Sequence, residues 1–292
     1  GPRSKGHAVW LRINPGFGHG HSNKTNTGGE HSKHGIWHTD LPAALAAIQQ
    51  HGLKLVGLHM HIGSGVDYGH LQQVCRTMVQ LVAQAGAARL PDLHAISAGG
   101  GLSIPYQADQ PRIDTAHYFS LWDAARQVVA QHLGHAVHLE IEPGRYLVAE
   151  SGVLVTQVRA SKHQGSQHFT LVDAGFSDLM RPAMYGSYHH ITVLGKEDIP
   201  CDHKYDVTGG LCENNDKFAI DRMLPKIDMG DLLVIHDTGA HGFSMGYNYN
   251  GRLRSAEILL KEDGSTQLIR RAETPKDYFA TFDFYDLFKD VQ

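Results

Sequence analysis

The sequence predicts an α/β region built on a parallel sheet, followed by a mostly antiparallel β region. Two observations support this fold class. In the first half, apolar strand-like runs recur about every 40 residues, and helical stretches lie between them. After about residue 150, short β-rich runs separated by Gly, Asp and Asn replace that alternation. Alternating strands and helices are typical of parallel sheets, whereas successive short strands favour antiparallel ones.

The first half contains four strand–helix units. Its strand-like runs are residues 9–13, 54–62, 93–98 and 137–143. The first helix is expected to begin at Thr39 or Asp40 as N-cap, with Pro42 in its first turn and Gly52 beyond its end. Two further helices are predicted from apolar residues at helical spacing: 71–82 and 118–129. Four units are too few to close an eight-stranded barrel.

The second half is expected to form a separate β domain, so the sequence predicts a division into residues 1–148 and 149–292. The predicted strands of the second domain are 153–160, 168–173, 189–194, 231–236, 255–260 and 266–271. A short aromatic helix is expected at 275–288.

Composition excludes several classes of protein. Apolar residues make up 41% and charged residues 19%, and the net charge of −4 argues against a nucleic-acid binder. No apolar run approaches the roughly 20 residues that span a bilayer, and the first residues lack a signal-peptide pattern. We therefore expect a cytoplasmic protein. The three cysteines form no CxxC pair, and Cys75 lies on an apolar helical stripe, which predicts a core position.

The strongest functional signal is a set of glycine-rich or charged segments at the ends of the predicted parallel strands, where barrel enzymes place their active sites. These segments are 59–65 (HMHIGSG), 99–101 (GGG) and 142–145 (EPGR). Consecutive glycines let backbone N–H groups approach an anion, and a nearby serine and arginine complete a phosphate cradle. A tight turn explains three glycines alone, but several such strand ends together favour an anion site.

Glu142 narrows the chemistry. A carboxylate beside a phosphate site is repulsive unless it faces a cation elsewhere on the ligand. A protonated pyridine nitrogen is such a cation, so this arrangement suits pyridoxal 5'-phosphate, which acts as an electron sink.

Seven motifs, in order, resemble the fold-type-III pyridoxal-phosphate decarboxylases, which share the alanine-racemase barrel. They are HIGSG (61–65), SAGGGL (97–102), EPGR (142–145), LVDAG (171–175), RPAMY (181–185), GGLCENND (209–216) and NYN (248–250). The RPAMY and CENND pair is similar to the diaminopimelate branch, and the resemblance covers essentially the whole chain. It implies the C-terminal half of a (β/α)8 barrel, a homodimer with shared active sites, and conversion of meso-2,6-diaminopimelate to L-lysine and CO2.

The resemblance also implies roles for individual residues. His61 would stack on the pyridine ring and Glu142 would pair with its nitrogen. The phosphate would be held by Ser64, Gly99, Gly100, Gly101, Gly144, Arg145 and Tyr249. Cys212 would be the general acid. Glu213 would bind the distal ammonium of the substrate, and Arg181 and Tyr185 its distal carboxylate.

The resemblance places the lysine that forms the cofactor's Schiff base upstream of the motifs seen here, because the chain opens at a strand similar to the fifth of eight. We therefore expect this chain to be inactive alone. Two alternatives stay open: another fold-type-III amino-acid decarboxylase (of the ornithine or carboxynorspermidine type) and a non-catalytic truncated relative.

The remaining polar residues have simpler interpretations. The 22 histidines include no HExxH motif, so no metal site is predicted. We expect His59 to be a hydrogen-bonded residue beneath the site and Arg12 to support His61. Asp173 is expected to be structural, and Asp216 either orients Glu213 or caps a turn.

Overall fold

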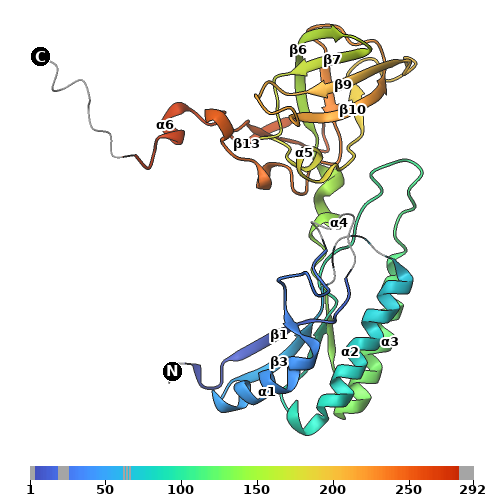
Figure 1. The fold of residues 1–292 in the computed structure, drawn as a ribbon, viewed down its shortest axis with the longest axis vertical. Helices are drawn as coiled ribbons and strands as arrows, with labels where there is room; N and C mark the ends of the chain where they lie inside the picture. Colours follow the sequence, from blue (N-terminus) through green and yellow to red (C-terminus); the bar gives the residue numbers. More distant parts are fainter. Residues whose placement is uncertain (1–3, 19–25, 62, 64, 66, 283–292) are drawn as a thin grey trace, which may run out of the picture. The chain divides into compact units, whose positions relative to one another are not determined.

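The computed structural model describes residues 4–18, 26–61, 63, 65 and 67–282. The chain divides into two compact units, Gly1–Ala149 (unit 1) and Glu150–Gln292 (unit 2). Figure 1 shows an α/β arrangement in unit 1 and a β-rich one in unit 2.

Unit 1 is built on a five-stranded sheet in which every pairing is parallel, as predicted. Its strands, in sheet order, are β2 (Ile36–Trp37), β1 (Ala8–Asn14), β3 (Lys54–His59), β4 (Ala95–Ser97) and β5 (His138–Glu140). The register places Arg12 beside His59, His59 beside Ser97, and Ser97 beside Glu140. The segments that follow these residues therefore leave the same edge of the sheet.

The three longer helices of unit 1 each begin directly after an aspartate, and two of them extend beyond the predicted ranges 71–82 and 118–129. The longer ones are α1 (Leu41–Gln50), α2 (Tyr68–Ala85) and α3 (Thr115–Leu133), and α4 (Gly144–Val148) is a short one. Asp40 is the N-cap residue of α1, as predicted, although its side chain makes no capping hydrogen bond. The carboxylates of Asp67 and Asp114 do cap α2 and α3. Short 3-10 turns are η2 (His38–Asp40), η3 (Ala87–Arg89) and η4 (Ala149–Ser151).

The core of unit 1 lies between the sheet and the helices. Leu58 and Ile96 of the sheet and Met78 and Trp122 of the helices are almost fully buried, and Cys75 joins this cluster as predicted. The sheet is closely packed at Gly57, since a Cβ there would lie 2.3 Å from the Trp10 ring of the neighbouring strand. Unit 1 therefore has a well-defined apolar interior.

Unit 2 contains a six-stranded sheet that is antiparallel except for the β7–β9 pair. The sheet order is β10 (Lys217–Leu224), β9 (His203–Thr208), β7 (Gln167–Val172), β6 (Leu154–Gln164), β11 (Leu232–Ile235) and β8 (Ile191–Val193). The predicted antiparallel character is confirmed. Strands β9 and β10 were not predicted.

The remaining elements of unit 2 are short. A separate hairpin pairs β12 (Glu257–Leu260) with β13 (Thr266–Arg270), and helices α5 (Arg181–Tyr185) and α6 (Pro275–Tyr278) flank the strands. Two 3-10 turns are η5 (Phe243–Met245) and η6 (Tyr249–Gly251). The predicted helix at 275–288 is shorter than expected, since the structure ends it at Tyr278 and residues 279–282 are not helical. Residues 283–288 of that prediction lie outside the described part. Phe279, Thr281 and Phe282 are weak helix formers, which accounts for the early end.

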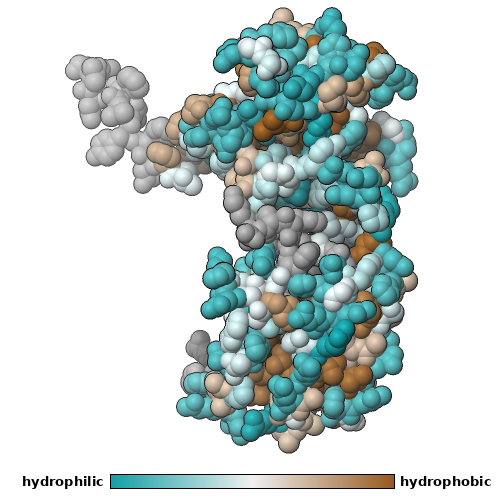
Figure 2. Space-filling view, turned by 45° about the vertical axis from the view of Figure 1, so that its right-hand side comes forward, coloured by the Kyte–Doolittle hydropathy of each residue, from teal (hydrophilic) through white to brown (hydrophobic). Residues whose placement is uncertain are grey.

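The surface is mixed in character. Figure 2 shows hydrophobic residues scattered among hydrophilic ones on the face it presents. Among the helices of the described residues, none is long and apolar enough to cross a membrane.

Candidate functional site

The imidazole of His61 lies at the strand-end edge of unit 1 and is anchored by backbone groups. The Gly100 N–H donates to its Nδ1 at 2.9 Å, so this nitrogen carries no proton and the proton of the neutral ring is on Nε2. The carbonyl of His61 accepts from the Arg12 guanidinium at 3.2 Å and from the Thr27 hydroxyl at 2.9 Å. The expected support from Arg12 is thus confirmed, and Thr27 adds a contact that the sequence did not predict.

Two histidines at this edge, His59 and His61, have lowered pKa values. Burial is the main cause for both His59 and His61, and the positive charge of Arg12 acts in the same direction. The two ring centroids are 6.5 Å apart. The lowered pKa values favour the neutral form of both rings, which for His61 agrees with the hydrogen bond that its Nδ1 accepts from Gly100.

Glu142 follows β5 and presents an exposed carboxylate. Its side chain is 63% exposed, and its Oε2 lies 3.3 Å from Nε2 of the nearly buried His59. Its backbone N–H donates to the Gly99 carbonyl at 2.9 Å, which ties the end of β5 to the glycine turn after β4. The expectation that His59 is a hydrogen-bonded residue is confirmed. The exposed carboxylate is available to a cationic group of a ligand.

Backbone atoms pack closely around the glycine turn 99–101. A Cβ at Gly99 would lie 2.7 Å from the Met60 carbonyl oxygen, and one at Gly101 would lie 2.3 Å from that of Gly63. Gly99 and Gly101 also have positive φ angles of 67° and 103°. Glycine is therefore required here for both space and conformation.

The glycine turn is only partly open to an anion. The Gly99 N–H donates to the Ser97 hydroxyl at 3.1 Å and the Gly100 N–H donates to His61. Two of the three N–H groups that the sequence assigned to a phosphate thus have partners within the protein. Ser64, the predicted hydroxyl ligand, lies outside the described residues.

Gly144 and Arg145 begin the short helix α4. The Gly144 N–H donates to the Glu142 carbonyl at 2.9 Å, and the Arg145 guanidinium lies 6.0 Å from the centre of the Tyr106 ring. Both residues therefore belong to the same strand-end region of unit 1 as Glu142.

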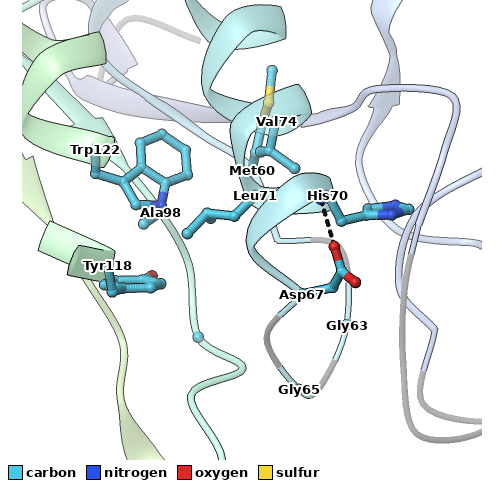
Figure 3. Close-up of a pocket in the computed structure, with 11 residues that line it drawn as sticks. Met60, Gly63, Gly65, Asp67, His70, Leu71, Val74, Ala98, Tyr118 and Trp122 are labelled. Carbon is cyan, nitrogen blue, oxygen red and sulfur yellow. Dashed lines mark hydrogen bonds between the residues drawn. The ribbon is translucent and has the colours of Figure 1, made fainter. Parts of the chain in front are cut away.

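A pocket opens next to the glycine turn, between the sheet and helices α2 and α3 (Figure 3). Its walls include the apolar side chains of Met60, Leu71 and Trp122, and Asp67, which caps His70 N–H at 2.8 Å. Among the residues that the structure describes, Gly100 is the one predicted site residue in this lining. The described lining of the pocket thus combines apolar side chains with the Asp67 carboxylate and with glycines of the strand-end segments.

Unit 2 brings a second set of predicted residues together in the segment Gly209–Asp216, here called the Cys212 loop. Cys212 and Glu213 are both exposed. The Asn250 amide donates to the Cys212 sulfur at 3.2 Å, and the Tyr249 hydroxyl donates to the Glu213 carboxylate. The latter bond raises the pKa of Tyr249 to about 12. Cys212, Glu213 and Tyr249 therefore form one cluster.

Tyr249 has a single O–H proton, and in this structure Glu213 accepts it. The same hydroxyl cannot donate to a phosphate at the same time. Tyr249 can therefore donate either to Glu213 or to a phosphate, but not to both in one state of the protein.

Arg181 and Tyr185 lie at the two ends of α5. Arg181 is 5% exposed, and its guanidinium contacts His189 Nε2 at 2.8 Å. His189 is fully buried, and its Nδ1 lies 2.8 Å from the His236 carbonyl oxygen. Tyr185 is half-buried. The predicted carboxylate-binding arginine is thus held inside unit 2 by a histidine partner that the sequence did not predict.

Asp173 has hydrogen-bond partners on the neighbouring strand. Asp173 accepts from the Thr156 hydroxyl at 2.7 Å and the Gln157 N–H at 2.9 Å, which confirms a structural role between β6 and β7. Within the described part of the chain, no group of three or more His, Cys, Asp or Glu residues could hold a metal ion.

Comparisons with known proteins agree with this arrangement. Residues 2–149 match the family model described as the pyridoxal binding domain of pyridoxal-dependent decarboxylases. The chain is 59% identical over 291 residues to the diaminopimelate decarboxylase of Escherichia coli strain K12, and the match covers 96% of this chain and 68% of that protein.

Solved structures give the same result. A crystal structure of diaminopimelate decarboxylase matches with a TM-score of 0.89 and 59% identity, covering 96% of this chain and 68% of that one. The Helicobacter pylori diaminopimelate decarboxylase complexed with L-lysine matches with a TM-score of 0.81 and 30% identity over the same shares. The fold of unit 1 is accordingly part of a (β/α) barrel, and the chain belongs to the diaminopimelate decarboxylase family of pyridoxal-dependent decarboxylases.

Proposed function

We propose that this chain carries the cofactor and substrate groups of an enzyme that converts meso-2,6-diaminopimelate to L-lysine and CO2. The observation that carries the proposal is the exposed Glu142 carboxylate, which contacts His59, at the same strand-end edge as the backbone-anchored His61 ring. The chain that carries these groups is 59% identical to a diaminopimelate decarboxylase. The L-lysine complex of the Helicobacter pylori relative supports the proposed product.

The groups at the strand ends of unit 1 fit pyridoxal 5'-phosphate. This cofactor supplies a cationic ring that accepts the electrons left when a carboxylate departs as CO2. Glu142 would hold the proton on the ring nitrogen, because a carboxylate next to that nitrogen stabilises its cationic form. The neutral His61 ring would stack on the cofactor without adding a positive charge. Ser64, Gly101 and Arg145 would hold the phosphate. Gly99, Gly100 and Gly144 would join them only by exchanging the present partners of their N–H groups, Ser97, His61 and Glu142, for the phosphate. Tyr249 would join only when its hydroxyl leaves Glu213.

In unit 2, Cys212 would act on the carbon that loses CO2. Its thiol proton would move from Sγ to that carbon, which neutralises the negative charge left there when CO2 departs. The resulting thiolate would be reprotonated from solvent. Glu213 would bind the distal ammonium of the substrate. Asn250 donates to Cys212 Sγ and thereby orients the sulfur.

Arg181 and Tyr185 would recognise the distal carboxylate, which distinguishes diaminopimelate from substrates that end in an ammonium alone. A guanidinium presents its N–H donors as a planar fork that matches a carboxylate in a bidentate contact. Because Arg181 is almost fully buried, a carboxylate would have to approach it at the edge of α5.

We further propose that the protein acts as a homodimer with shared active sites and works in the cytoplasm. The basis for both is the family resemblance. Light scattering of the purified protein and fractionation of the cells that make it would test these two points.

The direct test of the function is L-lysine formation from meso-diaminopimelate with added pyridoxal phosphate, measured on this chain and on the complete gene product. We expect the complete protein to be active. Cys212→Ala should lower its kcat by roughly 100-fold or more with little change in KM, because it removes a proton donor. Glu213→Gln should mainly raise KM. A silent complete protein would contradict the proposed substrate, and activity with ornithine instead would favour the alternative decarboxylase.

A further inference from the structure

Asp216 is a buried carboxylate at the end of the Cys212 loop, and it has no role in the chemistry described above. Only 3% of its surface is exposed. Oδ1 accepts from the Phe176 N–H at 2.7 Å, and Oδ2 accepts from the Leu211 N–H at 2.8 Å. Each oxygen therefore binds a backbone donor from a different segment, one before the Cys212 loop in sequence and one within it.

The backbone of Asp216 closes the loop as well. Its carbonyl accepts from the Gly209 N–H at 2.9 Å, and its N–H donates to the Glu213 carbonyl at 3.0 Å. The loop that carries Cys212 is thus bonded to Asp216 at Gly209, Leu211 and Glu213.

Two glycines make room for this carboxylate. A Cβ at Gly209 would lie 2.2 Å from Asp216 Oδ2, and one at Gly175 would lie 3.3 Å from Oδ1. Gly209 has no positive φ, so its small size rather than its backbone conformation is what the carboxylate needs.

Asp216 also connects the loop to its aromatic support. Phe176 donates its backbone N–H to Asp216, and its ring packs edge-on against the rings of Tyr247 and Tyr249, with centroid distances of 5.8 and 5.4 Å. Tyr249 in turn donates to Glu213. A continuous set of contacts therefore runs from the buried carboxylate back to the exposed carboxylate of the loop.

We propose that Asp216 is a positioning residue: it fixes the Cys212 loop so that Cys212 and Glu213 are presented in a defined geometry. This inference rests on the proposed function for its kinetic consequences. The structural part of it, that Asp216 orders the loop, stands on the hydrogen bonds alone.

The test compares Asp216→Asn and Gly209→Ala in the complete gene product. An asparagine keeps the shape of the side chain but turns one of the two acceptors into a donor that faces a backbone N–H. Gly209→Ala leaves Asp216 intact and displaces its carboxylate through the added Cβ. The matched control is Asp206→Asn, because Asp206 is equally buried but binds Lys217 and the Asp221 N–H instead of the loop.

Hydrogen exchange gives the readout that does not depend on activity. Both test variants should exchange the amides of residues 174–177 and 209–216 faster, on the order of 10- to 100-fold, since a hydrogen bond to a charged group is lost. The control breaks an ion pair between β9 and β10, so amides of these strands should exchange faster in it, whereas those of Phe176 and Leu211, which Asp216 binds, should not. If neither test variant speeds exchange there, Asp216 does not order the loop and the proposal is wrong.

A double-mutant cycle then separates positioning from a general structural effect. Asp216→Asn should lower kcat/KM by roughly 10- to 100-fold in the parent, because misplacement of catalytic groups is costly, and by much less in a Glu213→Gln background. The same loss in both backgrounds would mean that Asp216 acts independently of Glu213. If the parent does not decarboxylate diaminopimelate, the proposed function fails, and the exchange data still decide whether Asp216 orders the loop.

Discussion

Replacing Gly99 with alanine is expected to destabilise unit 1 by more than the backbone conformation alone requires. Gly99 has φ +67°, and an added Cβ would lie 2.6 Å from His61 Cβ and 2.7 Å from the Met60 carbonyl oxygen. Alanine in a left-handed conformation costs about 1–2 kcal/mol. Forcing a methyl group into a packed region costs about 1–3 kcal/mol more. The free energy of unfolding should therefore fall by about 2–5 kcal/mol.

Gly134 provides the matched control. It has φ +78° at the end of α3, but a Cβ there would meet no atom within 4 Å. Gly134→Ala should cost only about 1–2 kcal/mol. All three tryptophans of the chain, Trp10, Trp37 and Trp122, lie in unit 1, so their fluorescence during urea unfolding reports on this unit. Equal losses in the two variants would refute the reasoning from close packing.

Three further predictions concern charge and hydrogen bonding. Burial lowers the pKa values of His59 and His61, so below about pH 6.5 the unfolded chain binds protons that the folded chain does not. The stability of unit 1 should therefore fall as the pH falls through this range and stay constant above it. Tryptophan fluorescence should show a weaker pH dependence of stability in His61→Asn. Lys217→Met should cost unit 2 about 3 kcal/mol by leaving the buried Asp206 carboxylate without its partner at 3.0 Å; unchanged hydrogen exchange in β9 and β10 would speak against this. Tyr249→Phe should weaken pyridoxal-phosphate binding by the complete gene product by about 10-fold if the hydroxyl serves the phosphate, whereas an effect on KM alone would assign the hydroxyl to Glu213.

The sequence predicted the sheet of unit 1 well because its strands are apolar and lie between helices with clear periodicity. It did not predict β9 and β10, and the reason is visible at Asp206 and Lys217. These residues form an ion pair between the two strands, with the aspartate buried, so charged side chains stand where a strand is expected to be apolar. Strand β2, with two residues, is too short to give any periodic signal.

The sequence motifs predicted which residues of the candidate site lie close together. His61, Glu142 and the glycine turn meet as expected because parallel strands end at one edge of a sheet. The partners of these residues could not be predicted, since they depend on distances between segments far apart in sequence. The contacts of Arg181 with His189, of Asn250 with Cys212 and of Gly100 with His61 are of this kind.

The division of the chain into two compact units has a consequence for how such an enzyme can evolve. The groups proposed to retain the cofactor ring, His61 and Glu142, all belong to unit 1, and those proposed to select the substrate, Arg181 and Glu213, all belong to unit 2. Each set is supported by its own core. Changes that alter substrate preference can therefore accumulate in one core while the other, with its cofactor groups, is inherited unchanged.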